Sequence, residues 1–255
     1  MIVNNFKLLS LPAFRLHWNQ QKRSFINKIR RAFFIAAAGF IILSVAVCVL
    51  LRWLPPPTSA FMLYRHVDDL VDEGAFKPIS YRWVGKKKIS PFAGAAAMAA
   101  EDQRFPDHVG FDLDSIEASI NQYRKGHHLR GASTISQQVA KNLFLTPARS
   151  FLRKGAEVWF TLLIEMLWSK ERILEVYLNI AEFGDHIFGV EAASQRYFKI
   201  RASRLSRSQA ALLAASLPNP IKLKVAQPSA YLLRRQAWIL RQMANLPDPD
   251  PALMH

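Results

Sequence analysis

Apolar positions along the chain form one long uninterrupted run and, after it, shorter segments with the spacing of amphipathic helices. The long run is AFFIAAAGFIILSVAVCVLL, residues 32–51, which has 20 consecutive residues without a charged side chain. A helix rises about 1.5 Å per residue, so this run would cross roughly 30 Å of hydrocarbon. The pattern predicts a transmembrane helix over 32–52. The alternative is a cleaved signal peptide, whose apolar region is usually only about 7–15 residues long.

Basic residues before this run predict its orientation in a membrane. Residues 1–31 hold seven Lys or Arg and no acidic residue, whereas residues 53–75 hold one basic residue and four acidic ones. Because positively charged flanks stay in the cytoplasm, we expect residues 1–31 to be cytoplasmic and the body of the protein to face outward. In a Gram-negative host, this orientation makes it a single-pass inner-membrane protein with a periplasmic body.

The segments after the run predict a body that is mainly α-helical. Three successive prolines in WLPPPTSAFM, residues 53–62, cannot continue a helix and predict a short stiff linker. Residues 63–245 are expected to form the main domain, and residues 246–255 a tail. The only fair strand signal is YRWVGKKKI, residues 81–89.

Capping residues predict where the helices of this body begin. Ser90 and Pro91 open an alanine-rich helix that carries Glu101 near its end, and Pro106 follows as a breaker. The remaining helix signals are Asp114 with Glu117 and a closing Gly126, Thr134 with Gln137, either Thr146 with Pro147 or Ser150, then Ser169, Ser206 with Gln209, and a last basic amphipathic helix over 229–245.

The segment TISQQVAKNLFL, residues 134–145, has two different faces. Ile135, Val139 and Leu143 recur at helical spacing and predict the buried face. The polar face carries Thr134, Gln138, Lys141 and Asn142. A solvated helix surface is one interpretation of this face, but surface helices favour Glu and Lys over amides and hydroxyls. The polar face is therefore a candidate substrate-binding surface.

Charge and cysteine content narrow the function classes. The formal net charge is +15, but residues 1–52 hold eight basic residues and no acidic one, so the remainder has a net charge of +7. A basic body beside a bilayer attracts phosphates and anionic head groups. We expect no nucleic acid partner, because the anchor separates the protein from it. Cys48 is the only cysteine, so no intrachain disulfide is possible.

Two glutamates are candidate catalytic groups. Glu101 ends an apolar helix, where partial burial would raise the pKa of its carboxyl group and suit it to proton transfer. Glu157 follows Arg153 by four residues and Lys154 by three, so all three share one helix face. They form either an ordinary surface ion pair or a clamp for a phosphate, and spacing alone does not choose. His108 is either a site residue or a loop histidine with a structural partner.

Four segments, in this order, resemble the motifs of the peptidoglycan glycosyltransferases, also called family 51 glycosyltransferases. They are EDQRFPDHVG, GASTISQQVAKN, RKGAE and KERILEVYLN. The resemblance covers about residues 90–220 and points in particular to the monofunctional biosynthetic transglycosylase branch. Departures are mild, since Ser136 stands where Thr is usual and Val139 where Leu is usual.

The resemblance implies roles for individual residues. Glu101 matches the family's catalytic base, and Glu157 matches a second catalytic glutamate that lies with the donor's pyrophosphate. No cofactor is certain, although Mg²⁺ or Mn²⁺ at that pyrophosphate, held by Glu157, is an option. The residues that match substrate-binding positions are Asp102, Phe105, His108, Ser133, Thr134, Gln138, Lys141, Asn142, Arg153 and Lys154.

The resemblance also implies an activity and a fold. The family transfers a growing glycan from its polyprenyl pyrophosphate to the 4-hydroxyl of lipid II, with inversion to a β-1,4 bond. Its fold is a lysozyme-like helical domain with a small membrane-associated jaw lobe, expected here over roughly 110–152. Leu143, Phe144 and Leu145 belong either to that lobe or to the core. The implied partners are lipid II, the growing strand, the bilayer and other cell-wall synthesis proteins.

Two other function classes compete with this interpretation. A lytic transglycosylase would cleave glycan with an acidic glutamate, but it has no use for a phosphate clamp. A non-catalytic scaffold of the cell-wall machinery would not be expected to carry both glutamates. We expect no transpeptidase activity, because neither a Ser-x-x-Lys nor a Lys-Thr-Gly motif occurs in the chain.

Overall fold

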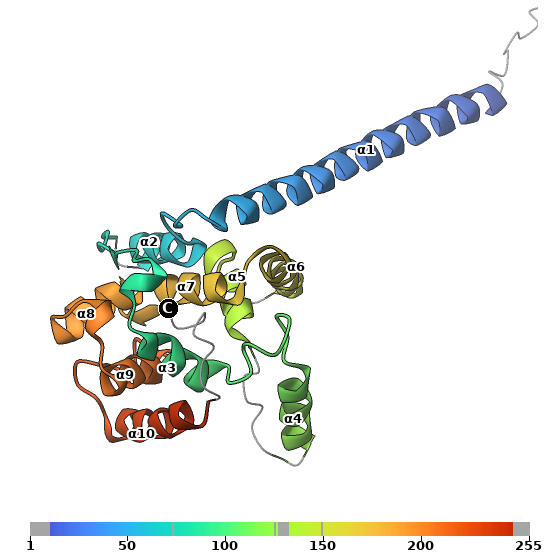
Figure 1. Ribbon diagram of the computed structural model, residues 1–255. Coiled ribbons are helices and arrows are strands. Elements are labelled where there is room, and N and C mark those ends of the chain that lie inside the picture. Colours follow the sequence, from blue (N-terminus) through green and yellow to red (C-terminus); the bar gives the residue numbers. More distant parts are fainter. Residues whose placement is uncertain (1–10, 73, 125, 127–132, 149, 247–255) are drawn as a thin grey trace, which may run out of the picture. The chain divides into compact units, whose positions relative to one another are not determined.

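The structure of the protein is a computed structural model that describes residues 11–72, 74–124, 126, 133–148 and 150–246 (Figure 1). The chain forms two compact units, Met1–Val47 and Cys48–His255. The predicted N-terminal segment 1–31 is described only from residue 11, and the predicted tail 246–255 only at residue 246.

The first unit contains most of helix α1, Leu11–Leu51. Its segment Phe25–Leu51 is long and apolar enough to cross a membrane, and most of its residues are exposed. A helix in the core of a soluble protein would be mostly buried, so this exposed apolar surface agrees with the predicted span. The helix also extends further toward the N-terminus than the predicted span, through the basic residues that precede it.

The second unit is mainly α-helical, as predicted. Its helices are α2 (Ala60–Asp72), α3 (Pro91–Glu101), α4 (Leu113–Arg124), α5 (Ile135–Phe144), α6 (Phe151–Leu167), α7 (Lys170–Ile180), α8 (Val190–Phe198), α9 (Arg207–Ser216) and α10 (Ala230–Asn245). Two short 3₁₀ helices are η1 (Lys86–Lys88) and η2 (Ala202–Arg204). Short strands β1 (Ser80–Tyr81), β2 (Glu182–Gly184) and β3 (Ile187–Phe188) pair in the order β1-β3-β2.

Most of the predicted helix starts are confirmed by side-chain bonds. Thr134 and Gln137 form a reciprocal capping box at α5, and Ser206 with Gln209 does the same at α9. At α6 the cap is Ser150, whose hydroxyl accepts from the backbone N–H of Arg153, so the helix does not start at the alternative, Thr146 with Pro147. Ser169 and Ser229 cap α7 and α10. These bonds span three residues, so the local sequence is enough to predict them.

The predicted start of α4 was wrong. Asp112 accepts a hydrogen bond from the backbone N–H of Ser115 at 3.0 Å and is the capping residue, instead of Asp114. Asp114 lies within the first turn and pairs with Arg104, a partner from the preceding loop. At the other end, Gly126 has a φ of +84° and follows the last helical residue, Arg124, as predicted.

The predicted strand over 81–89 was also largely wrong. Only Ser80 and Tyr81 pair with a neighbouring strand, and residues 86–88 form η1. Asn179 binds both backbone groups of Val84 at 2.9 Å, so α7 side chains replace the strand partners that the pattern predicted. Strands β2 and β3 were missed because they are two or three residues long and carry no alternating pattern.

The predicted linker over 53–62 is shorter in the structure. Helix α2 begins at Ala60, and the hydroxyl of Ser59 accepts from the backbone N–H of Met62 at 3.2 Å as a cap. The side chain of Met62 is buried, which explains why the helix starts this early. The three prolines themselves lie outside any helix, as predicted.

Two helix packings position the candidate site. Helix α3 packs on α9 and α10 through small residues such as Ala96, Ala99 and Ala211, which are fully buried and allow close approach. Helix α5 packs on α6 and α7, where Ile135 and Val139 are fully buried, each contributing about 1.5–3 kcal/mol. The C-terminal end of α3 therefore lies between α5 and α10.

The jaw lobe over roughly 110–152 stays a prediction. Residues 125, 127–132 and 149 of that range lie outside the described residues. Leu143 is buried, and the ring of Phe144 stacks on Phe160 of α6 with centroids 4.3 Å apart. Of the two roles left open for these residues, the structure supports core packing.

Candidate active site

Glu101 ends α3, and its carboxylate contacts both α5 and α10. Gln138 donates from Nε2 to one carboxylate oxygen at 3.0 Å, and Arg235 donates from Nη2 to the other at 3.2 Å. The side chain is 15% exposed. Burial raises the pKa of this carboxyl group, although Gln138 and Arg235 offset part of the effect. A raised pKa makes the carboxylate a better proton acceptor, which is what a general base requires.

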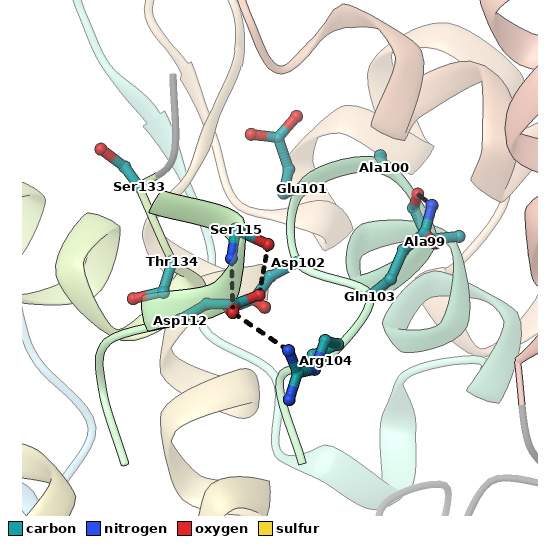
Figure 2. Close-up of a pocket in the computed structure, with 10 residues that line it drawn as sticks. All are labelled: Ala99, Ala100, Glu101, Asp102, Gln103, Arg104, Asp112, Ser115, Ser133 and Thr134. Atoms are coloured by element: carbon teal, nitrogen blue, oxygen red, sulfur yellow. Dashed lines mark hydrogen bonds and ion pairs between the residues drawn. The ribbon is translucent and has the colours of Figure 1, made fainter. Parts of the chain in front are cut away.

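A pocket of about 260 Å³ opens beside Glu101 (Figure 2). Ser133, just before α5, lines the pocket and is exposed. On another part of the wall, Asp112 accepts from Ser115 and from Arg104. Figure 2 shows the carboxylate of Glu101 pointing away from this bonded group. Glu101 thus lines the pocket without a bond to Asp112, Ser115 or Arg104, and its carboxylate is held by Gln138 and Arg235.

The orientation of the Gln138 amide is determined by a buried tyrosine. The hydroxyl of Tyr177 on α7 donates to the amide oxygen of Gln138 at 3.3 Å. Burial raises the pKa of Tyr177 well above its ordinary value, so the phenol keeps its proton, and because the ionised carboxylate of Glu101 only accepts, the amide oxygen of Gln138 is left to the phenol. The amide nitrogen of Gln138 must then face Glu101, and this fixes one oxygen of the carboxylate.

Four residues expected to bind substrate are buried and bonded within the protein. Asp102 accepts from His108 Nε2 at 3.0 Å and from the backbone N–H of Ile135 at 2.9 Å. Phe105 is fully buried against the ring of His108, and Thr134 donates to the carbonyl oxygen of Gly110 at 2.7 Å. The loop after α3 is therefore joined to the start of α5 by these four side chains, Asp102, Phe105, His108 and Thr134.

This arrangement changes the expectation for these four side chains. Asp102 and Thr134 border the pocket, but their polar atoms have internal partners. For His108, the structure supports the alternative of a loop histidine with a structural partner. Substrate contact by the four stays a prediction, whereas their part in placing Glu101 opposite Gln138 follows from the observed bonds.

Glu157 forms the centre of a second charged group on α6. It is 4% exposed and accepts from Arg153 Nη1 at 2.7 Å and from Lys154 Nζ at 2.5 Å. An ordinary surface ion pair would leave the carboxylate in solvent, so burial argues against that interpretation. A guanidinium has five N–H donors and an ammonium three, so Arg153 and Lys154 can still bind an anion while Glu157 holds them.

Lys141 on α5 connects the two glutamates. It is half-buried, and burial lowers the pKa of its ammonium group, while the charges of Glu157 and Glu101 both act in the opposite direction. Lys141 is therefore within electrostatic reach of both carboxylates. Asn142, the next residue, is also half-buried. The structure thus brings the motifs that carry Glu101, Lys141 and Glu157 into one site.

Comparisons with known proteins agree with this arrangement of motifs. The model of the family described as Transglycosylase matches residues 70–244, more than half of the chain. The chain belongs to the transglycosylase family.

Curated members of the family are similar to most of the chain. A biosynthetic peptidoglycan transglycosylase of Mannheimia succiniciproducens is 50% identical over 230 residues, which cover 88% of this chain and 94% of that protein. Its namesake in Shigella boydii serotype 4 is 55% identical over 212 residues, 82% and 84% of the two chains. The namesake in Escherichia coli O127:H6 is 58% identical over 194 residues, 75% and 80% of the two chains.

Membership of the transglycosylase family supports peptidoglycan transglycosylase activity for this chain, with peptidoglycan glycan as the substrate. It places the protein in cell-wall synthesis, where an N-terminal helix able to cross a membrane is consistent with anchoring.

The transglycosylase site does not fit a resident metal ion at Glu157. Both carboxylate oxygens lie within hydrogen-bond distance of a cation. Among the residues that the structure describes, no group of three His, Cys, Asp or Glu side chains could hold a metal. The side chains alone therefore do not form a resident cation site at Glu157, whereas Mg²⁺ or Mn²⁺ shared between Glu157 and the donor's pyrophosphate stays a prediction.

Two residues of the transglycosylase site were not singled out in the sequence. Arg235 lies in the basic helix predicted over 229–245, but nothing local distinguishes it from Arg234 or Arg241. Tyr177 lies within the segment KERILEVYLN, whose apolar spacing predicts core packing. Only the packing of α10 on α3, and of α7 on α5, brings these two residues to Glu101 and Gln138.

Proposed function

We propose that the protein polymerises the glycan strands of peptidoglycan, transferring a polyprenyl-pyrophosphate-linked glycan to the 4-hydroxyl of lipid II. The observation that carries this proposal is that α5, the helix of Lys141, bonds Glu101 through Gln138 and packs against α6, the helix of Glu157. One site then combines a buried carboxylate beside a pocket with a group of cations. Transfer from a pyrophosphate needs both features, whereas glycan hydrolysis needs an acid for its leaving group and no phosphate site.

Glu101 acts on the acceptor in this mechanism. As the acceptor's 4-hydroxyl oxygen attacks the anomeric carbon of the donor, its proton passes to the Glu101 carboxylate. Attack on the face opposite the leaving group inverts the α-linkage of the donor to a β-1,4 bond. Arg235 and Gln138 hold the two carboxylate oxygens, and the exposed Ser133 is available to the acceptor sugar.

The cations act on the donor. The bond between the anomeric carbon and the pyrophosphate oxygen breaks, and the electron pair leaves with the pyrophosphate, which needs no proton. Arg153, Lys154 and Lys141 neutralise the growing negative charge through charge-assisted hydrogen bonds. Glu157 keeps the first two cations in place, and Asn142 adds an amide next to Lys141.

The proposed reaction takes place at a membrane, which the apolar N-terminal helix supports. In the proposal, Phe25–Leu51 crosses the cytoplasmic membrane once, with its basic side in the cytoplasm and the second unit outside. A lipid-linked substrate then lies in the same bilayer as the anchor. Crosslinking of the strands by transpeptidation is left to other proteins.

Replacement of Glu101 by glutamine tests the base. Glu101→Gln keeps the shape of the side chain but cannot accept the proton, so polymerisation of labelled lipid II should slow at least about 100-fold. Binding of lipid II should persist. Asp107→Asn, at an exposed position in the same loop, is the matched control and should keep the wild-type rate. A Glu101→Gln enzyme that polymerises at full rate would refute the assignment.

Replacement of Arg153 tests the donor side. Arg153→Ala removes a cation from the pyrophosphate position, so the apparent KM for the donor should rise and the rate should fall, with little change for the acceptor. Equal damage to donor and acceptor use contradicts the assignment. Incubation of the wild-type protein with purified glycan strands tests the lytic alternative. Shortened strands would overturn the proposal, because they would show that the protein cleaves glycan and does not extend it.

A further inference from the structure

A second pocket lies away from Glu101 and has a volume of about 560 Å³. On one side it is lined by the segment after β1, including Arg82, Trp83 and Lys88, and on the other by Glu191 and Arg201. Helix α3 begins at residue 91, just after this segment, and its 11 residues extend about 16 Å before reaching Glu101. We name this cavity the basic pocket. It is not part of the site proposed for glycan transfer.

The basic pocket has an excess of positive charge. Arg82, Lys88 and Arg201 are exposed, and within the described ranges none of the three has a carboxylate at ion-pairing distance. The carboxylate of Glu191 is 4% exposed and accepts from the backbone N–H of Ala202 at 2.7 Å, so it serves the fold. Three available cations around one cavity favour an anionic ligand, and phosphate oxygens match both guanidinium and ammonium donors.

The wall of the basic pocket is held rigidly by α7. The side chain of Asn179, fully buried, accepts from the N–H of Val84 and donates to its carbonyl oxygen, both at 2.9 Å. The carboxylate of Glu175 accepts from the backbone N–H of Lys86 at 2.8 Å. These bonds fix the backbone between Trp83 and Lys88 before any ligand arrives, which lowers the entropy cost of binding.

The basic pocket is also adjacent to the end of the apolar segment of α1. The guanidinium of Arg172 lies 5.0 Å from the ring centre of Trp83. The same guanidinium donates to the carbonyl oxygens of Leu51 at 2.8 Å and Leu54 at 2.7 Å. Leu51 is the last residue of the segment able to cross a membrane. If α1 crosses the membrane as proposed above, Trp83 is one side chain away from the level where the chain leaves the hydrocarbon, a level at which tryptophan is enriched.

We propose that the basic pocket binds the phosphate head group of an anionic glycerophospholipid from the surrounding bilayer. Arg82, Lys88 and Arg201 bind the phosphate oxygens, and the ring of Trp83 packs beside the glycerol portion. Guanidinium and ammonium groups bind phosphate oxygens through charge-assisted hydrogen bonds, and a basic surface beside a bilayer attracts anionic head groups. The bound lipid holds the second unit at the membrane surface and involves no residue of the proposed glycan-transfer site.

Native mass spectrometry of the full chain, released from detergent micelles, tests this site directly. Phosphatidylglycerol and phosphatidylcholine are titrated in separate arms, and binding is counted per protein. The site variant is Arg82→Gln with Lys88→Gln and Arg201→Gln. The matched control is Lys222→Gln with Lys224→Gln and Arg241→Gln, three exposed positions outside the pocket that lose the same charge. Circular dichroism verifies that both variants are folded.

We expect the site variant to bind phosphatidylglycerol at least about tenfold more weakly than the wild-type protein, and the control to stay within about twofold. Phosphatidylcholine should bind all three proteins alike. Equal losses in both variants, or no loss in the site variant, overturn the proposal. A further arm adds inorganic pyrophosphate, and its displacement of phosphatidylglycerol at equal concentration would assign the pocket to a free anion instead. None of these readouts depends on catalysis, so they are independent of the function proposed above.

Discussion

Asp102 is the residue next to the proposed base, yet its replacement should act mainly on stability. Its side chain is 2% exposed and accepts from His108 and from the backbone N–H of Ile135. Asp102→Ala removes both acceptors while the donors stay buried. The substitution therefore tests whether this part of the first motif binds substrate or joins the loop after α3 to α5.

The magnitude follows from the two bonds that are lost. An orphaned buried N–H at Ile135 costs about 1–3 kcal/mol, and the hydrogen bond from His108 to a charged group contributes about 1.5–3 kcal/mol. Breaking a buried pair by removing one partner costs about 3–5 kcal/mol in other proteins, so we expect a loss in that range. At about 2–4 °C per kcal/mol for a domain of this size, the Tm should fall by roughly 6–20 °C. Asp102→Asn keeps an oxygen for Ile135 and should cost less than half as much.

Thermal unfolding followed by near-ultraviolet circular dichroism in detergent measures this loss. Asp107→Ala, which removes an exposed carboxylate from the same loop, should change the stability by no more than about 0.5 kcal/mol. A double-mutant cycle of Asp102→Ala with His108→Ala should show a coupling of at least about 0.5 kcal/mol, because the two side chains are in contact.

One result would refute this reasoning. If Asp102→Ala unfolds within about 2 °C of the wild-type protein, a shift equal to at most about 1 kcal/mol, the internal bonds contribute little. If that stable variant has also lost polymerisation, Asp102 must be assigned to the substrate, as the sequence resemblance implied.

Three further predictions concern the site and its supports. Because burial raises the pKa of Glu101, its base form is lost as the pH falls through that raised value, so the polymerisation rate should decline on the acidic side at a higher pH than an ordinary glutamate would give. Arg235→Met removes a cation that lowers this pKa and should move the decline to still higher pH. An unchanged pH profile of the Arg235→Met variant contradicts the ion pair. Gly110→Ala should destabilise the protein by at least about 2 kcal/mol, because φ is +80° and the new Cβ would lie 2.8 Å from Thr161 Cγ2. Gly155→Ala is the control, since its new Cβ would meet nothing within 4 Å, and it should be neutral or stabilising in thermal unfolding. Tyr177→Phe releases the amide of Gln138, so kcat should fall about fivefold, equivalent to about 1 kcal/mol, with little change in Tm; a wild-type kcat would show that the amide orientation does not depend on the phenol.

The sequence was a sufficient guide where the interactions are local. The capping boxes of Thr134 with Gln137 and of Ser206 with Gln209 close within three residues, so their partners are visible in the sequence. The apolar segment of α1 is likewise a property of consecutive residues. The prediction failed at α4, where a partner from the preceding loop, Arg104, pairs with Asp114 and leaves the capping role to Asp112.

By itself, the sequence determined which chemical groups are present and, for the helices, which face each group occupies. Glu101 and Glu157 were candidates from their neighbours alone, but they are 56 positions apart, and no local pattern states that one lysine reaches both. The packing of α5 against α6 decides that, because it brings Lys141 near enough for the charges of both carboxylates to act on its pKa. Arg235 reaches Glu101 from 134 residues further along the chain. Contacts of this kind depend on how buried faces fit together, so only the tertiary structure decides them.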